Sequence, residues 1–227
     1  MIPKIIHMIW IGNKKPPIWC IDSWKNDYIN KYSDWNFILW NEEKINSIEM
    51  VNRELYDAEP TLRGKSDIAR YEILYKYGGI FLDADSFWIE KDNSDLNILL
   101  EKTKINNHDF FCANESKSKQ YFANGVFGCT KNNIILNKII YYIKDTYYSE
   151  KKKHNHKYSI WLVTGPVPFT KIVTNNINKV EIFPSHYFFP ESYNKDNINI
   201  ELKDMSKLFP NSFMYQYWLS HTDYYKE

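Results

Sequence analysis

Residues 66 to 86 read SDIARYEILYKYGGIFLDADS, and this stretch decides how the chain is expected to fold. Its first part predicts a helix over Ser66–Tyr77, which Gly78 and Gly79 stop. The apolar residues that follow predict a buried strand over Ile80–Asp83. A second aspartate, Asp85, comes two residues later.

The expected helix and the extended chain after it have nearly equal lengths. The helix spans about 18 Å at ~1.5 Å per residue, and the path to Asp85 covers about 17 Å at ~3.3 Å per residue. If the glycines reverse the chain, Asp67 and Arg70, which share a helix face, return beside Asp83 and Asp85. Four charged groups would then meet at the carboxyl end of a strand, where open α/β sheets bind their ligands.

The elements around this stretch predict an α/β fold. Strands are expected within residues 4–12 and 34–40, with helical segments over 19–32 and around 41–56. This order favours a mostly parallel central sheet flanked by helices. Because no Ser/Gly-rich linker and no repeat occurs, we expect residues 1–227 to form a single domain.

The second half of the chain is less regular. An amphipathic helix is expected over 132–148, followed by a solvated loop over EKKKHNHK, 150–157. TGPVPFTKIV is expected to be a loop that enters a helix at a proline. Short strands are expected in DFFCA, GVFGC and VEIF, and the chain ends in an aromatic tail.

Charge and composition exclude several classes of protein. Lysine and arginine nearly balance aspartate and glutamate, at a net charge of +1, so we expect no sequence-independent binding of nucleic acid. The three cysteines are far apart, which favours a reducing compartment. The amino terminus shows no cleavable leader and no apolar run is long enough for a transmembrane segment, so a cytoplasmic protein is expected.

The aspartates of the DAD sequence are candidate ligands for a divalent cation. Two carboxylates on alternate residues after a strand can hold a hard divalent cation weakly, leaving room for water and substrate oxygens. Such a cation can bridge two phosphates and neutralise a leaving diphosphate. Arg70 would add a fixed positive charge, and Asp67 would accept hydrogen bonds from hydroxyls.

The same residues carry a family resemblance. SDIARYEILYKYGGIFLDAD resembles the pattern SDxxRYxxLYxxGGxYxDxD of the DxD-motif glycosyltransferases with a sugar-binding region, glycosyltransferase family 32. That group includes yeast mannosyltransferases and capsular polysaccharide sugar transferases, and more distantly the clostridial glucosylating toxins. Phe81 departs from the usual tyrosine. The opening IPKIIHMIWIGNKKPP, the segment ANGVFG and the tripeptide TGP also resemble family segments.

The resemblance implies a GT-A type nucleotide-sugar-binding fold and a glycosyltransferase of polysaccharide biosynthesis. Such an enzyme moves a hexose from a nucleotide-diphosphate sugar, with a UDP-hexose favoured, to a sugar hydroxyl on a glycan acceptor. Mn2+ or Mg2+ would assist, and the anomeric configuration would be retained. Residues 1–92 would form the nucleotide-binding half with the DxD motif, and residues 93–227 the acceptor half with the C-terminal tail.

The family's functional residues map onto matching positions. The resemblance places Trp10 on the nucleotide base and Asn124 on the donor sugar, which Asp67 and Arg70 also hold. Asp85 is expected to bind the metal directly, and Asp83 to serve the ribose and a metal-bound water.

The C-terminal tail departs from the family. Relatives tend to end in HHWxxSW, whereas this chain has QYWLSHT, so that Gln216 and Tyr217 replace the histidines when Trp218 is aligned. Trp218 is expected to contact the nucleotide sugar. Either the carbonyl oxygen of Gln216 or the imidazole of His221 would complete the metal ligands.

Two other classes of function remain open. A metal-dependent nucleotidyl or phosphoryl transferase could use the same carboxylates and would release pyrophosphate or phosphate. A non-catalytic carbohydrate-binding module could use the high aromatic content, 17% of residues, although packing in the core explains that content more simply.

Overall fold

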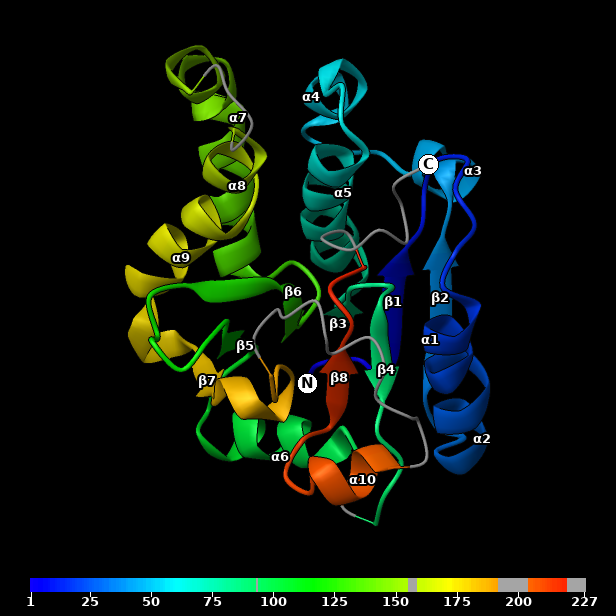
Figure 1. Cartoon of the computed structure of the whole chain (residues 1–227). Coiled ribbons are helices and arrows are strands. Elements are labelled where there is room, and N and C mark those ends of the chain that lie inside the picture. The colour runs from blue at the N-terminus through cyan, green and yellow to red at the C-terminus, as the bar shows by residue number, and fades with distance from the viewer. Residues whose placement is uncertain (93, 155–158, 192–203, 220–227) are drawn as a thin grey trace.

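A computed structural model describes residues 1–92, 94–154, 159–191 and 204–219. Its centre is a six-stranded sheet in the order β2-β1-β3-β6-β5-β7 (Figure 1). Only β6 runs against its neighbours, since it pairs antiparallel with both β3 and β5. The other adjacent pairs are parallel. The expectation of a mostly parallel sheet flanked by helices is therefore confirmed.

The strands and helices have the following bounds. The sheet strands are β1 Ile5–Ile9, β2 Asn36–Trp40, β3 Gly79–Leu82, β5 Phe110–Asn114, β6 Phe122–Cys129 and β7 Glu181–Phe183. The helices are α1 Ile18–Asp22, η1 Ser23–Tyr28, α2 Ile29–Lys31, α3 Glu42–Asn46, α4 Arg53–Ala58, α5 Leu62–Tyr77, α6 Asn97–Ile105, α7 Ile134–Lys153, α8 Ser159–Val163, α9 Pro166–Thr174, η2 Ile177–Lys179, η3 Ser185–Tyr187 and α10 Met205–Leu208.

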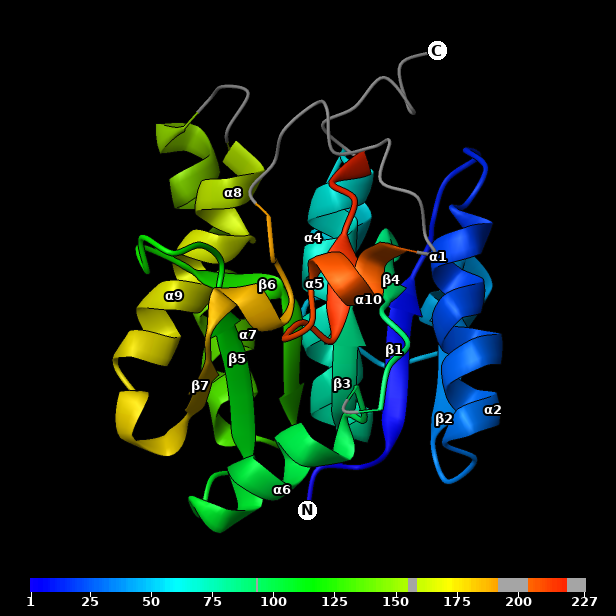
Figure 2. The same ribbon diagram turned by 60° about the horizontal axis from the view of Figure 1, so that its bottom comes forward.

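Alternate residues of the strands feed two cores on opposite faces of the sheet. On β3, Phe81 packs with α5, α7 and α9, whereas Ile80 and Leu82 pack with η1, α6 and the C-terminal segment. This is the two-residue period of a buried strand. Figure 2 shows α6 and α10 in front of the sheet and α5 behind it. Most aromatic side chains of the described residues lie in these cores or pack against them, which explains the aromatic content by packing.

The glycine reversal at the end of α5 is present. Gly78 and Gly79 have φ of 66° and 106°, a region that side chains with a Cβ rarely adopt. A Cβ on Gly79 would lie 2.6 Å from the carbonyl oxygen of Ile5. His7 Nε2 bonds the carbonyl oxygen of Gly78 at 2.9 Å, and Trp40 Nε1 donates to its Nδ1 at 3.0 Å. Burial lowers the pKa of His7 to about 4, so this ring is neutral.

Several predicted boundaries were wrong. The helix expected from Ser66 begins at Leu62, because Thr61 caps it by accepting from the Gly64 N–H at 3.1 Å. The helical stretch around 41–56 is two helices, α3 and α4.

The expected loop over 150–157 was also partly wrong, since α7 continues to Lys153. Lys151 donates to the buried Glu59 carboxylate at 2.7 Å, a tertiary contact that sequence periodicity does not reveal. Residues 155–158 lie outside the described residues.

The C-terminal segment forms an element that the sequence did not predict. Strand β8, Met214–Gln216, pairs antiparallel with β4, Ser86–Trp88, directly after the DAD sequence. This two-stranded sheet stands in front of the central sheet in Figure 2. It brings residues near the end of the chain onto the aspartates.

Within the described segments, every helix is too short or too polar to cross a bilayer.

Candidate active site

Asp67 is fixed by the surrounding side chains. It lies in the second turn of α5 and is 7% exposed. Its Oδ1 accepts from Asn124 Nδ2 at 2.9 Å, and its Oδ2 accepts from Thr164 Oγ1 at 3.1 Å. A third residue, Tyr71, donates its hydroxyl to the Thr164 carbonyl and accepts from Asn124 Nδ2. The carboxylate is thus held between α5, β6 and the turn before α9.

Arg70 connects the helix to the strand. Its Nη1 lies 3.1 Å from Asp83 Oδ1 and donates to the Asn124 carbonyl at 2.9 Å. Its Nη2 donates to Ser66 Oγ at 3.0 Å and lies 3.4 Å from Asp67 Oδ1, while Nε bonds the Ser66 carbonyl at 3.3 Å. These contacts engage all three guanidinium nitrogens. The guanidinium also stacks 4.4 Å above the Phe81 ring, so it acts here as an internal brace.

Asp83 and Asp85 lie on the turn that follows β3, so the strand expected to reach Asp83 ends one residue earlier. Strand β3 ends at Leu82, and the Ser86 N–H donates to the Asp83 carbonyl at 3.0 Å. Asp83 approaches β6 so closely that a Cβ on Gly125 would lie 2.3 Å from its Oδ2. Glycine at position 125 therefore makes room for the carboxylate.

Asp85 is held by the C-terminal segment. The side-chain amide of Gln216 donates to Asp85 Oδ1, and the Leu219 N–H donates to Oδ2 at 2.9 Å. The Tyr217 N–H donates to the Asp85 carbonyl at 3.0 Å. The two donors to the carboxylate are neutral, so these hydrogen bonds orient it without cancelling its charge.

The predicted convergence of Asp67, Arg70, Asp83 and Asp85 is confirmed by these contacts. Three carboxylates face one guanidinium, which leaves a formal charge of −2 when all are ionised. Burial raises the pKa of Asp67 to about 6, with Arg70 opposing the shift. Burial and then Asp83 raise the pKa of Asp85 to about 6. Burial also raises the pKa of Asp83, against the effect of Arg70.

Burial disfavours the charge on Arg70 as well, but Asp83 and Asp67 outweigh it and raise the pKa of the guanidinium. The site formed by these four charged groups therefore carries more negative than positive charge. A divalent cation would balance that excess.

The sequence also places Trp10, Trp218 and His221 in the site. Trp10 follows β1 at the same edge of the sheet, partly buried, and its Nε1 donates to the Lys14 carbonyl at 2.9 Å. Trp218 has a φ of 53° and packs on Phe189 with ring centroids 5.5 Å apart. His221 lies outside the described residues.

Gln216 offers an observation that bears on a metal. The side chain is 5% exposed, and its Oε1 meets no hydrogen-bond partner among the described residues. An orphaned buried carbonyl oxygen on a side chain that bonds Asp85 matches the oxygen ligands that Mn2+ and Mg2+ prefer. The donor set therefore fits a divalent cation held by Asp85, Asp83 and Gln216.

Sequence reasoning missed the residues that orient Asp67. Tyr71 lies one helical turn after Asp67, so its position on the same face of α5 was available as a signal. Thr164 belongs to the TGP tripeptide, which resembles a family segment but carries no local signal of a contact with Asp67. A Cβ on Gly165 would meet Asp67 Oδ2 at 3.4 Å, so this turn packs closely against the carboxylate.

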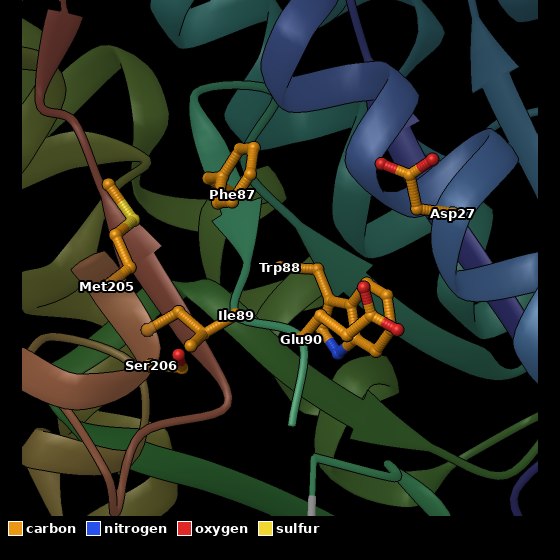
Figure 3. A pocket seen from close by; sticks show the side chains of 7 residues that line it. All are labelled: Asp27, Phe87, Trp88, Ile89, Glu90, Met205 and Ser206. Carbon is orange, nitrogen blue, oxygen red and sulfur yellow. The ribbon is translucent and has the colours of Figure 1, made fainter. Parts of the chain in front are cut away.

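A pocket of about 330 Å³ opens between η1, β4 and α10 (Figure 3). It begins at Phe87, two residues after Asp85, and carries the carboxylates of Asp27 and Glu90. Burial, and then Glu90, raise the pKa of Asp27. The other lining residues are Trp88, Ile89, Met205 and Ser206. The four converging charged groups lie outside this lining.

The fold and the charged corner together define a class: the chain has the GT-A fold of glycosyltransferases, with a DxD turn at the carboxyl edge of the sheet. The solved UDP-bound glycosyltransferase domain of the YGT toxin has this fold, with a TM-score of 0.54 at 11% identity over 80% of this chain and 79% of that one.

Residues 20–105 match the family described as "Glycosyltransferase sugar-binding region containing DXD motif". The resemblance suggested by the sequence is therefore confirmed.

Two curated relatives show how far the similarity extends. Inositol phosphoceramide mannosyltransferase 3 of Schizosaccharomyces pombe is 36% identical over 88 residues, 37% of this chain and 24% of that protein. The chain thus spans about a quarter of the length of this mannosyltransferase. An uncharacterized glycosyltransferase, L373, of Acanthamoeba polyphaga mimivirus is 28% identical over 97% of this chain and 85% of its own length.

Proposed function

We propose that the protein transfers a hexose from a nucleotide-diphosphate sugar, a UDP-sugar in the first instance, to a sugar hydroxyl. The observation that carries this proposal is the corner where three carboxylates face the single guanidinium of Arg70. An anionic diphosphate cannot approach a site with a charge of −2 unless a cation comes with it. The UDP bound to the structural neighbour and the mannosyltransferase name of the relative support this chemistry.

Asp85, Asp83 and the Gln216 carbonyl would hold Mn2+ or Mg2+, which supplies Lewis-acid stabilisation of the leaving diphosphate. Asp85 is suited to direct ligation because the described contacts to its carboxylate come from neutral N–H groups. Asp83 has one oxygen paired with Arg70 and keeps the other for water or the ribose.

The residues of α5 and β6 would position the donor sugar. Asp67 accepts hydrogen bonds and is held rigidly by Thr164 and Asn124, so it can bind sugar hydroxyls without reorganising. Arg70 keeps Asp67 and Asp83 at fixed separation, and Trp10 and Trp218 would contact the nucleotide sugar. In this proposal residues 1–92 bind the nucleotide, residues 93–227 bind a glycan acceptor, and the anomeric configuration is retained.

The test is a panel of nucleotide sugars, each with manganese or with a chelator, scored for thermal stabilisation and for the released product. We expect one UDP-sugar to stabilise the protein and to release UDP slowly by hydrolysis, both only with the metal present. Release of pyrophosphate or phosphate would instead identify a nucleotidyl or phosphoryl transferase. Glycan binding that resists chelation, without turnover of any nucleotide sugar, would identify a carbohydrate-binding module.

A further inference from the structure

A second pocket, of about 180 Å³, lies at the carboxyl ends of β5 and β7. The loop after β5 and the short helix η3 form its walls. Because β5 and β7 run parallel to β3, this pocket opens at the same edge of the sheet as the DxD turn. We call it the basic pocket; its lining includes Asn114, Ser116, Lys117, Lys119, Ser185 and His186.

The groups of the basic pocket are hydrogen-bond donors with positive charge. Lys117 and Lys119 are exposed and pair with no carboxylate among the described residues. Ser185 is 7% exposed, and its hydroxyl makes no hydrogen bond within the described part of the chain. The acid of this loop, Glu115, is absent from the pocket lining, and burial raises its pKa. The pocket therefore gathers a serine hydroxyl without a described hydrogen bond and two lysines without a described carboxylate partner, a donor set that favours an anionic ligand.

The hydrogen-bond donors of the basic pocket suit a phosphate better than a carboxylate. Lysine ammonium groups, serine hydroxyls and an imidazole are separate point donors, which suit the tetrahedral oxygens of a phosphate. Arginine forks, which suit a planar carboxylate, do not line this pocket. The pocket of Figure 3 has the opposite character, because Asp27 and Glu90 would repel an anion.

The sheet geometry relates the basic pocket to the DxD turn. Strand β5 is two strands from β3, about 10 Å across the sheet. Asn114 pairs with Phe122, whereas Asp83 bonds Gly125, which adds about 10 Å along β6. The two sites are therefore about 14 Å apart by strand spacing alone, too far for one phosphate to reach both. One acceptor molecule can bridge them.

We propose that the basic pocket binds a phosphate group of the acceptor, so that an acceptor hydroxyl on the same molecule reaches the donor sugar. This inference rests on the proposed transferase function, because only a transferase has an acceptor. A soluble sugar phosphate and a phosphorylated lipid headgroup share the required chemistry.

Direct binding tests the basic pocket without turnover. Glucose 6-phosphate, with glucose as the uncharged control, is titrated by calorimetry at low salt. We expect binding of the phosphate alone and an affinity about tenfold weaker in the double variant Lys117→Glu/Lys119→Glu, since charge-assisted hydrogen bonds are lost. The matched control is Lys104→Glu/Lys131→Glu, two exposed lysines at the opposite edge of the sheet, which changes the net charge equally and is expected to bind as the wild type.

Co-sedimentation with vesicles separates the two sources of phosphate. Vesicles of phosphatidylcholine with phosphatidylinositol are compared with phosphatidylcholine alone, using the same variants. A parallel loss of vesicle binding in Lys117→Glu/Lys119→Glu assigns the pocket to lipid headgroups, and loss of glucose 6-phosphate binding alone assigns it to soluble phosphates.

The proposal would be overturned if the wild-type protein bound neither glucose 6-phosphate nor the phosphatidylinositol vesicles. It would also be overturned if the control pair weakened binding as much as Lys117→Glu/Lys119→Glu. UDP stabilisation of the wild-type protein with manganese is measured in parallel. Failure of UDP binding alone overturns the transferase function, whereas failure of phosphate binding alone overturns only the assignment of the basic pocket.

Discussion

Asp83 and Asp85 are two residues apart, yet the protein holds them in opposite ways. Asp83 directly follows a buried strand and is paired with the guanidinium of Arg70. Asp85 rests on the C-terminal segment, where Gln216 and Leu219 donate neutral hydrogen bonds. The first charge is compensated inside the fold, and the second is left for a ligand. Changes on the Asp83 side should therefore damage stability first, and changes on the Asp85 side should damage activity first.

Arg70→Met should have the largest effect. It leaves the buried Asp67 carboxylate and the partly exposed Asp83 carboxylate without a counter-charge, so we expect a loss of about 3–5 kcal/mol in the free energy of unfolding. Urea denaturation at neutral pH measures it. Arg53→Met is the control, because Arg53 pairs with the mostly exposed Asp57 at 3.8 Å and should cost about 1–2 kcal/mol. Equal losses in the two variants would refute the bracing role of Arg70.

Asp85→Asn should separate activity from folding. The amide keeps the shape of the side chain but removes the charge that attracts a cation, so we expect transfer to fall about 10²–10³-fold. The free energy of unfolding should change by less than about 1 kcal/mol. Initial rates with the UDP-sugar chosen from the panel measure the loss, with the exposed Asp57→Asn as control. Wild-type rates in Asp85→Asn would remove Asp85 from the site.

Asp67→Asn should change how stability depends on pH. The pKa of Asp67 in the folded protein is about 6, above its ordinary 3.8, because of burial. The folded state therefore holds this proton more tightly than the unfolded chain, and the resulting stabilisation is present below about pH 4 and is lost as the pH rises to about 6. That loss is about 2–3 kcal/mol, and the asparagine variant lacks it.

The measurement is urea denaturation from pH 4 to pH 7 with a chelator present. The stability of Asp67→Asn relative to the wild type should increase across this range. Parallel curves for the two proteins would show that burial of Asp67 does not shift its pKa.

Gln216→Leu should have the smallest of the four effects. It removes the orphaned Oε1 together with the hydrogen bond to Asp85, so we expect manganese to bind about tenfold more weakly. Titration of thermal stabilisation with manganese in the presence of UDP measures the change. Gln216→Glu, which keeps an oxygen at this position and adds charge, should bind manganese at least as well as the wild type. Weakening by both variants alike would exclude an oxygen ligand at position 216.

The Asp67–Asp83 side of the site could be predicted from the sequence because its geometry is local. The helix of α5, the reversal at Gly78 and Gly79 and the strand β3 are contiguous, and their lengths alone return Arg70 to Asp83. The exact helix start was wrong by one turn, since the cap at Thr61 competes with later candidates. That error did not disturb the convergence.

The Asp85 side could not be predicted because its contacts are remote and its strands are short. Strands β4 and β8 have three residues each, too few for a period to be recognised, and about 130 positions separate Asp85 from Gln216. The hydrogen bond from Thr164 to Asp67 crosses 97 positions in the same way. Contacts between residues so far apart in the sequence depend on the tertiary arrangement of the strands, which local sequence patterns do not predict.

The Asp85 carboxylate accepts a hydrogen bond from Leu219 and would also bind the cation, so cation binding is linked to the backbone conformation at Leu219. Its Oδ2 accepts a hydrogen bond from the Leu219 N–H. A cation that binds this oxygen would compete with that hydrogen bond to the backbone after β8. By thermodynamic reciprocity, if cation binding shifts the conformational equilibrium at Leu219, that conformational change shifts the cation affinity by the same factor. The Leu219 amide therefore serves as a reporter: its hydrogen-exchange protection should read out the occupancy of the metal site.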